Sequence, residues 1–167
     1  MVLWSVGSAH TNTGVTVYSP EESSETQACP TRWEHLEHGA DIGVFGTGPT
    51  LEAAFEQAAV ALTAIVCEPH RVRLRDRVAV HCAAPENELL FYEWLNTVIF
   101  EMATREMLFG RYQVQIHQGR LSGTLLGEPV DPRRHQPAVE PKGATFTGLE
   151  VRQDARGCWR AQCIIDV

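Results

Sequence analysis

The fold of this chain is constrained most by a pair of segments with helical periodicity, set among stretches in which apolar and polar residues alternate. In residues 50–67, apolar residues recur at steps of three and four, with Thr50 as a predicted N-cap and Pro69 beyond the end. Residues 87–104 have a wide apolar sector, which predicts a helix packed centrally against a sheet. We therefore predict an α+β fold in a single domain, with a mainly antiparallel sheet packed against two amphipathic helices.

Strands are predicted where apolar and polar residues alternate, and residues 33–45 are the first such stretch. A tight turn at Gly39-Ala40-Asp41 divides it into two strands. Residues 71–82 predict one strand or two short ones, and a predicted arginine ladder shares one face of it: Arg71, Arg73, Arg75 and Arg77. That face is either simply exposed or a surface for a phosphate backbone or an acidic partner.

The C-terminal part of the chain contains further strand signals. Residues 112–125 predict a hairpin, and residues 144–153 and 158–167 predict an antiparallel pair that closes the chain. Residues 127–135 carry too many prolines for a regular strand and too many charges for a core, which indicates a crossover loop with one helical turn at 131–135.

The sequence divides into an extension and one domain. Residues 1–30 have no basic residue and no sustained periodicity, which indicates a flexible extension with at most a short strand at 15–18. Residues 31–167 are enough for one domain with a substantial core. No apolar run has the length that crosses a bilayer, and the N-terminus lacks the features of a secretory signal. We therefore predict a cytoplasmic protein with no membrane partner.

The cysteines and the net charge bear on two properties, the redox state of the thiols and the binding of nucleic acids. Five cysteines, without a C-x-x-C pair, predict reduced thiols that act as small, mostly buried hydrophobic residues. The formal net charge of -7 argues against a general nucleic-acid binder, which needs a basic surface to gain from counterion release. Contact with RNA is expected only locally or through a partner.

Two carboxylates far apart in the sequence are candidates for a metal site. Asp41 is flanked by small residues, and Asp166 stands beside Val167, whose terminal carboxylate would add an oxygen ligand. If the fold brings them together, they form a hard-oxygen site suited to Ca²⁺ or Mg²⁺. The alternative is that Asp41 serves the turn and Asp166 is a solvated strand end. His35 and His38 have a spacing that zinc sites use on helices, but the neighbouring glycines favour turn or satisfied polar histidines.

Lys142 is the single lysine among 14 basic residues. Because every other basic residue is an arginine, the retained lysine suggests a site that needs a compact ammonium with rotatable donors. Chance retention is the alternative interpretation.

Several short motifs follow one another in a fixed order along the chain. They are His38-x-Ala40-Asp41-Ile42-Gly43, Thr50-Leu51-Glu52-Ala53-Ala54-Phe55, Trp94-Leu95-Asn96, Gly127-Glu128-Pro129-x-Asp131-Pro132-x-Arg134-His135, Lys142 and Ile165-Asp166-Val167. Each motif alone is weak, but their order, their spacing and the position at the end of the chain are specific. With these motifs, the sequence from about Trp33 to Val167 resembles the archease family.

The resemblance implies a single α+β archease domain over residues 31–167 and an accessory role without turnover of its own. Archeases activate the GTP-dependent RNA ligase of tRNA splicing and RNA repair, by promoting guanylylation of the ligase's histidine and multiple turnover. The resemblance also implies a divalent metal, Ca²⁺ first with Mg²⁺ or Mn²⁺ as alternatives, at Asp41, Asp166 and the main-chain or terminal oxygens of Val167. Lys142 matches a lysine on which family activity depends. His38 and His135 are weaker candidates for the site.

Two departures from the family pattern affect the expected detail. The family usually has Thr where this chain has Gly39, which is expected to loosen the turn around Asp41, and a frequent His is absent near Thr147. Two other functions stay open. One is a metal-dependent phosphohydrolase or nuclease that uses Asp41, Asp166 and His135. The other is a chaperone-like scaffold for RNA-modifying enzymes that needs no metal.

Overall fold

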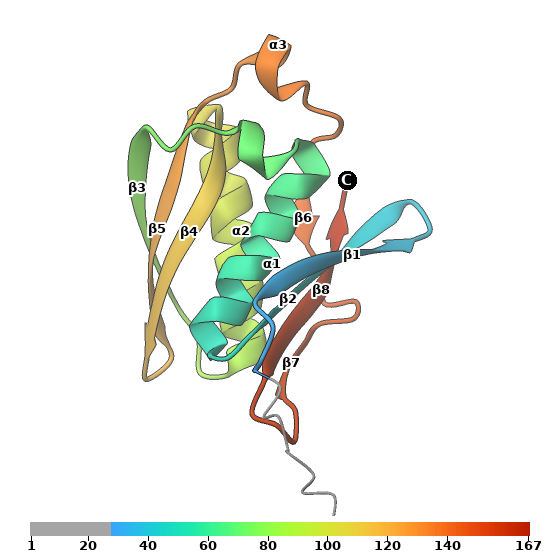
Figure 1. Ribbon diagram of the computed structural model, residues 1–167, viewed down its shortest axis with the longest axis vertical. Coiled ribbons are helices and arrows are strands. Elements are labelled where there is room, and N and C mark those ends of the chain that lie inside the picture. The colour runs from blue at the N-terminus through green and yellow to red at the C-terminus, as the bar shows by residue number, and fades with distance from the viewer. Residues whose placement is uncertain (1–27) are drawn as a thin grey trace, which may run out of the picture.

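Two long helices lie at the centre of the protein in this computed structural model, which describes residues 28–167 (Figure 1). Helix α1 is Leu51–Val66 and helix α2 is Asn87–Arg105, so both predicted helices are confirmed. The Thr50 hydroxyl accepts a hydrogen bond from the main-chain N–H of Ala53 at 3.1 Å, which confirms the predicted N-cap. Helix α2 ends where Glu106 adopts a left-handed conformation, with φ at 52°.

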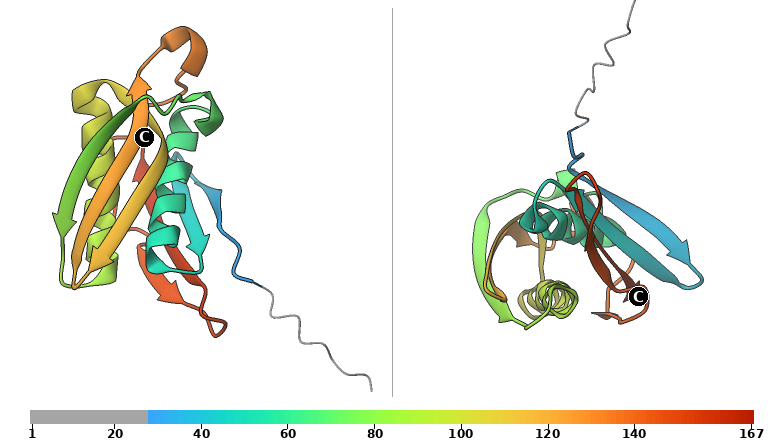
Figure 2. Two further views of the ribbon diagram at one scale, coloured as in Figure 1. Left: turned by 60° about the vertical axis from the view of Figure 1, so that its left-hand side comes forward. Right: turned by 90° about the horizontal axis from the view of Figure 1, so that it is seen from below.

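Antiparallel sheets lie on both sides of the helices, and Figure 2 shows the helices between them. The five-stranded sheet has the order β1-β2-β8-β6, with β7 also paired to β8, and the three-stranded sheet has the order β3-β5-β4. The α+β prediction is confirmed, although the strands form two sheets rather than one. The strands are β1 (Arg32–His38), β2 (Asp41–Gly48), β3 (Asp76–Ala83), β4 (Met107–His117), β5 (Arg120–Pro129), β6 (Gly143–Ala144), β7 (Glu150–Gln153) and β8 (Trp159–Asp166).

The core lies where the helices meet both sheets. Phe55 of α1 and Phe91 of α2 are fully buried, with ring centroids 4.9 Å apart. The indole of Trp94 donates a hydrogen bond to the main-chain oxygen of Phe55 at 3.1 Å, which satisfies the buried N–H. Strand β2 passes close to α1, because a Cβ on Gly46 would lie only 2.0 Å from the main-chain oxygen of Ala54. These contacts hold the five-stranded sheet, and therefore the ends of β2 and β8, firmly against α1.

The predicted arginine ladder at 71–77 is wrong. A 3-10 turn covers Pro69–Arg71, and β3 begins only at Asp76, so Arg77 is the one ladder residue that lies on the strand. The physical reason is a buried carboxylate: Glu128 accepts a hydrogen bond from the main-chain N–H of Arg73 at 2.8 Å, in place of a neighbouring strand.

The predicted strand at 144–153 is interrupted. Only its two ends pair with β8, as β6 and β7. Between them, the Thr145 hydroxyl donates to the main-chain oxygen of Ile164 at 3.0 Å and accepts from the N–H of Thr147 at 3.2 Å. The main-chain N–H of Thr145 also donates to Ile164 at 2.9 Å, and that of Ile164 donates to Thr147 at 3.1 Å, so the chain bulges at residues 145–147 instead of continuing the regular ladder.

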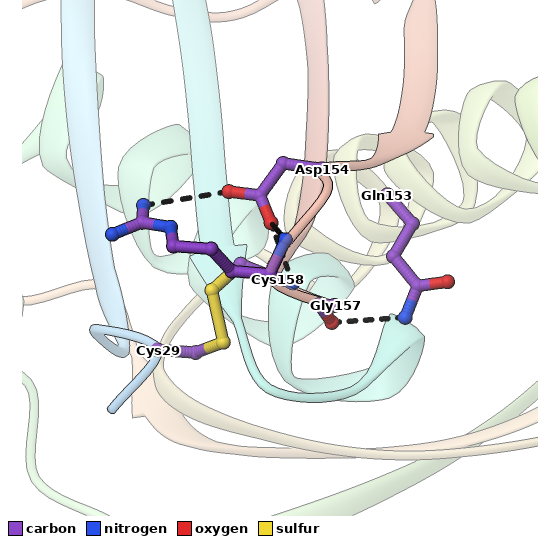
Figure 3. Close-up of a disulfide and its surroundings, with 6 residues drawn as sticks. Cys29, Gln153, Asp154, Gly157 and Cys158 are labelled. Atoms are coloured by element: carbon purple, nitrogen blue, oxygen red, sulfur yellow. Dashed lines mark hydrogen bonds and ion pairs between the residues drawn. A yellow bond between two sulfur atoms is a disulfide. The ribbon is translucent and has the colours of Figure 1, made fainter. Parts of the chain in front are cut away.

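The prediction that every cysteine is reduced is wrong for two of them. Cys29 and Cys158 form a disulfide, drawn in Figure 3. Their sequence separation of 129 leaves no spacing signal that could have been recognised. Cys67 and Cys163 are free and buried, as predicted, and burial raises the pKa of Cys163 to about 12.

Part of the predicted extension lies outside the described residues. This applies to residues 1–27 and thus to the predicted strand at 15–18, whereas Cys29 is joined to the domain through the disulfide. The domain boundary at residue 31 stays a prediction. In the part of the chain that the structure describes, no helix has the length and apolar character to span a membrane.

Candidate functional site

Asp41 and Asp166 lie at the same end of two neighbouring strands. Strand β2 begins at Asp41, strand β8 ends at Asp166, and their antiparallel register pairs Ile42 with Ile165. One further step along this register makes Asp41 and Asp166 the next opposing pair. Opposing residues of an antiparallel pair point to the same face with Cβ atoms about 4.5–5.5 Å apart. The strand order therefore brings together two carboxylates that are distant in sequence.

The turn before β2 fixes where Asp41 lies. Register pairing of His38 with Asp41 leaves Gly39 and Ala40 as a two-residue loop. Gly39 has a φ of 65°, and glycine at the first loop position is what a type II′ hairpin turn requires. The glycine at position 39, where a threonine was expected from the resemblance, therefore suits the local backbone. The structure gives no reason to expect a loosened turn. The other histidine of this region, His35, has its Nε2 hydrogen-bonded to the main-chain oxygen of Ala61 at 2.6 Å.

Lys142 approaches the same edge from the other side of β8. Its main-chain N–H donates to the main-chain oxygen of Asp166 at 2.8 Å, immediately before β6 begins. Its ammonium donates to the main-chain oxygen of Val167 at 3.0 Å. The C-terminal end of β8 therefore lies between β6 and the β1–β2 hairpin (Figure 1). We call the four residues at this end the carboxylate edge: Asp41, Lys142, Asp166 and Val167.

The donors at the carboxylate edge suit a hard divalent cation. Asp166 is exposed and Asp41 is half-buried, so solvent reaches both positions. Within residues 28–167, no three His, Cys, Asp or Glu side chains come together as a metal-binding group. An ion here would therefore be held by two carboxylates, main-chain oxygens and water, which is a ligand set that Ca²⁺ accepts. One of those main-chain oxygens already accepts a hydrogen bond from the Lys142 ammonium, so positive charge can approach this edge.

A second charged group lies under the short helix α3 (Pro132–His135), which confirms the predicted helical turn. Glu128 is only 2% exposed and is ion-paired with Arg134. The second carboxylate oxygen of Glu128 lies 3.2 Å from Nη2 of Arg134. The Arg134 guanidinium is the main cause that lowers the pKa of Glu128 to about 2, and the N–H of Arg73 adds to the effect. We call Glu128, Arg134 and His135 the buried charge cluster.

Both ring nitrogens of His135 are used within this cluster. Nδ1 accepts a hydrogen bond from the main-chain N–H of Asp131 at 2.9 Å. Nε2 therefore carries the proton and donates to Glu128 at 3.0 Å. His135 is 1% exposed, and it does not join Asp41 and Asp166 in a metal-binding group among the described residues. His135 thus orders the α3 loop rather than the carboxylate edge.

A groove beside Lys142 was missed by the sequence reasoning. It has a volume of about 600 Å³, and Pro141, the neighbour of Lys142, is one of its lining residues. Prolines recur in the lining segment, and this recurrence is the signal that could have indicated it. The groove lies between the C-terminal ends of α1 and α2 and the loop after β5, with walls that include Val66, Ile99, Met102, Pro129, Val130 and Pro137.

Comparisons with known proteins agree with this architecture. A family model described as the Archease protein family (MTH1598/TM1083) matches residues 33–167. The chain is 33% identical over 140 residues to Protein archease of Pyrococcus furiosus, covering 81% of this chain and 99% of that protein. It is 34% identical to Protein archease of Thermococcus gammatolerans, with the same coverage. The solution structure of Methanobacterium thermoautotrophicum protein 1598 superposes with a TM-score of 0.72 at 28% identity, covering 81% of this chain and 98% of that one.

Proposed function

The chain belongs to the archease family, and from that membership we propose that it is an accessory protein that activates a GTP-dependent RNA ligase in tRNA splicing or RNA repair. Activation would consist of promoting guanylylation of the ligase and sustaining its multiple turnover. The protein would have no turnover of its own. It would use a divalent ion at the carboxylate edge, Ca²⁺ first with Mg²⁺ or Mn²⁺ as alternatives.

The observation that carries this proposal is the convergence of three strands on the carboxylate edge. Asp41 begins β2, Asp166 ends β8 and Lys142 immediately precedes β6, so rigid elements position all three. Residues held on packed strands keep a fixed geometry better than residues on free loops. The edge is also solvent-accessible, since Lys142 and Asp166 are both exposed, so a partner protein can reach it.

The chemistry of nucleotide transfer explains why such an edge would help a ligase. Negative charge spreads over the phosphoryl oxygens in the transition state, and positioned cations lower its energy. A bound divalent ion would supply a fixed positive charge next to the partner's nucleotide. The two aspartates would hold that ion, and the Lys142 ammonium would add a mobile donor with rotatable N–H groups.

A scaffold function that needs no metal is the second candidate. The apolar groove next to Lys142 favours it, because contiguous apolar surface rimmed by polar residues is typical of protein contact sites. A hydrolase that uses His135 has no such support, since His135 is buried and fully hydrogen-bonded.

The proposal also places the protein in the cytoplasm. Thiols are kept mostly reduced there by glutathione and thioredoxin. The Cys29–Cys158 disulfide would then have to be protected from these reductants, which thiol labelling in intact cells followed by mass spectrometry can check.

The test is a guanylylation assay with the partner ligase, GTP and wild-type or variant protein. We expect Asp41→Asn, Asp166→Asn and Lys142→Met each to abolish stimulation, and chelation to abolish it in the wild type. Asp76→Asn and Arg77→Met, which change exposed charges on β3 of the other sheet, serve as matched controls. Normal stimulation by all three edge variants would reject the site, and full potency in chelator would favour the scaffold function.

A further inference from the structure

A row of arginines crosses the five-stranded sheet at the end opposite the carboxylate edge. The register pairs Arg32 of β1 with Thr47 of β2, Thr47 with Arg160 of β8, and Arg160 with Arg152 of β7. Directly opposing residues lie on one face, so the side chains of these four neighbouring strands line up. We call Arg32, Thr47, Arg152 and Arg160 the arginine row.

The arginine row lies on the outer face of the sheet. Ala161, which follows Arg160, is fully buried against the helices, and strand alternation then directs Arg160 outwards. A pocket of about 140 Å³ opens here, lined by the whole row and by Arg156 of the β7–β8 turn. Pro30 and Cys158 also line it, so the Cys29–Cys158 disulfide holds one wall in place. A chain with a net charge of -7 thus gathers four arginines around one small hollow.

Arg160 has unused hydrogen-bonding capacity. Its guanidinium lies over the Phe45 ring, 4.7 Å from the centroid, and this cation–π contact helps to hold the group in place. Among the described residues, its Nε is the one buried side-chain nitrogen or oxygen without a hydrogen-bond partner. Directly opposite it stands Arg152, and like charges at opposing positions destabilise a sheet. An anion between the two side chains would supply the missing acceptor and remove the repulsion.

The carboxylates near the row leave room for such an anion. Arg32 pairs with Glu34 at 3.0 Å and Arg152 pairs with Glu150 at 3.2 Å, but all four side chains are between 44% and 60% exposed. Exposed ion pairs of this kind contribute little, and a phosphate offers each guanidinium a stronger, bidentate partner.

Asp154, the carboxylate in the pocket wall, has a structural task. Its Oδ1 accepts hydrogen bonds from the main-chain N–H groups of Arg156 at 2.8 Å and Cys158 at 3.0 Å. Figure 3 labels Asp154 and Cys158. Those bonds, with the one from Cys158 foremost, lower the pKa of Asp154. The carboxylate therefore shapes the turn that carries Arg156, and its Oδ2 also pairs with the Arg156 guanidinium at 3.4 Å.

We propose that the arginine row is a phosphate-binding site that holds the sugar-phosphate backbone of an RNA strand. Strands lie about 4.8 Å apart, so a row across four of them spans about 14 Å, which exceeds the width of a single phosphate. Guanidinium groups on a sheet contact phosphates without reading bases, so binding would be independent of sequence. The site lies at the other end of β8 from Asp166, about 20 Å away at about 3.4 Å per residue. The phosphate site is carried by the row alone, whereas the choice of RNA as its ligand rests on the proposed function.

The test compares two double variants with the same loss of charge. Arg152→Gln with Arg160→Gln removes the opposed pair of the row, whereas Arg77→Gln with Arg111→Gln removes two exposed arginines of the other sheet. Both proteins and the wild type are titrated with inorganic phosphate, followed by the NMR signals of the arginine Nε–H groups. They are also titrated with a short fluorescent single-stranded RNA at several salt concentrations, followed by anisotropy, with a neutral peptide nucleic acid of the same sequence as a negative control.

We expect the row variant to lose RNA affinity by about tenfold or more, since each charged hydrogen-bonding partner contributes about that factor. We also expect a shallower salt dependence: the slope of log affinity against log salt concentration should fall by about 0.7 for each phosphate contact that is lost. The row variant should melt no lower than the wild type, because repulsion is removed. If inorganic phosphate shifts the NMR signals of the row but RNA does not bind, the site would be assigned to a small phosphate ligand, and the proposal that it binds RNA would be overturned. Equal behaviour of the two double variants, or no response to either probe, would overturn the site.

Discussion

The buried charge cluster and the carboxylate edge use similar side chains in opposite ways. In the cluster, Glu128 is 2% exposed, and its carboxylate accepts hydrogen bonds from Arg134, His135 and the main chain. At the edge, Asp166 is exposed, and the ammonium of Lys142 donates to the main-chain oxygen of Val167 instead. A charged group whose hydrogen bonds are all made within the protein supports the fold, whereas an exposed charged group is available to bind a ligand.

Glu128→Gln should give the largest effect in this comparison. Removing one partner of a buried pair leaves the other charge uncompensated and costs about 3 kcal/mol of unfolding free energy. Urea denaturation measures it. Asp166→Asn, which makes the same chemical change at the edge, is expected to stay within about 0.5 kcal/mol. Equal midpoints for the two variants would mean that the cluster and the edge do not differ as described.

Acid should weaken the cluster in a defined window. The pKa of Glu128 is about 2 in the folded protein, below its ordinary 4.5, so the unfolded chain binds more protons between these values. Its contribution is complete above about pH 4.5 and is lost as the pH falls towards 2. Thermal melting of wild type and Glu128→Gln across this range should show a difference in Tm that narrows as the pH falls. A constant difference would contradict the assignment.

Calcium should stabilise the protein through the edge alone. At a Ca²⁺ concentration about 100 times the Kd, binding to the folded state adds about 2.7 kcal/mol. Asp41→Asn and Asp166→Asn should melt like the wild type in chelator and fail to gain stability with Ca²⁺. Glu128→Gln should melt lower in both conditions yet gain as much as the wild type. A calcium response that survives both edge substitutions would place the ion elsewhere.

Lys142→Met should have the smallest effect on stability. The ammonium makes one exposed hydrogen bond, to Val167, and such contacts contribute less than about 1 kcal/mol. Differential scanning calorimetry in chelator can resolve the change. A loss as large as that of Glu128→Gln would show that Lys142 supports the fold, and its use as a functional probe would then fail.

Sequence reasoning succeeded where the signal was local. Both long helices and the closing strand follow from periodicity within a dozen residues or so, and the Thr50 cap follows from one side chain. It failed where a distant group decided the local structure. The main-chain N–H of Arg73 donates to the carboxylate of Glu128, 55 residues later in the chain, instead of to a neighbouring strand. The separation of the strands into two sheets likewise depends on pairing across the whole chain.

The residues of the candidate sites are likewise brought together by strand order and not by local sequence. Asp41 and Asp166 were proposed as neighbours from their residue type and from the family resemblance, and only strand order could place them. The clustered arginines at 71–77 suggested a basic surface that does not exist as a strand face. The arginines that do line up, Arg32, Arg152 and Arg160, come from three separate strands and show no local pattern.

The Cys29–Cys158 bond turns most of the domain into a closed covalent ring. If a protease cuts the backbone anywhere between the two cysteines, which are 129 positions apart, the two fragments remain covalently joined until a reductant is added. The same cut made after reduction would give two pieces that separate on a denaturing gel. Gel mobility with and without reductant would therefore report the thiol state of a sample directly, before any functional assay is attempted.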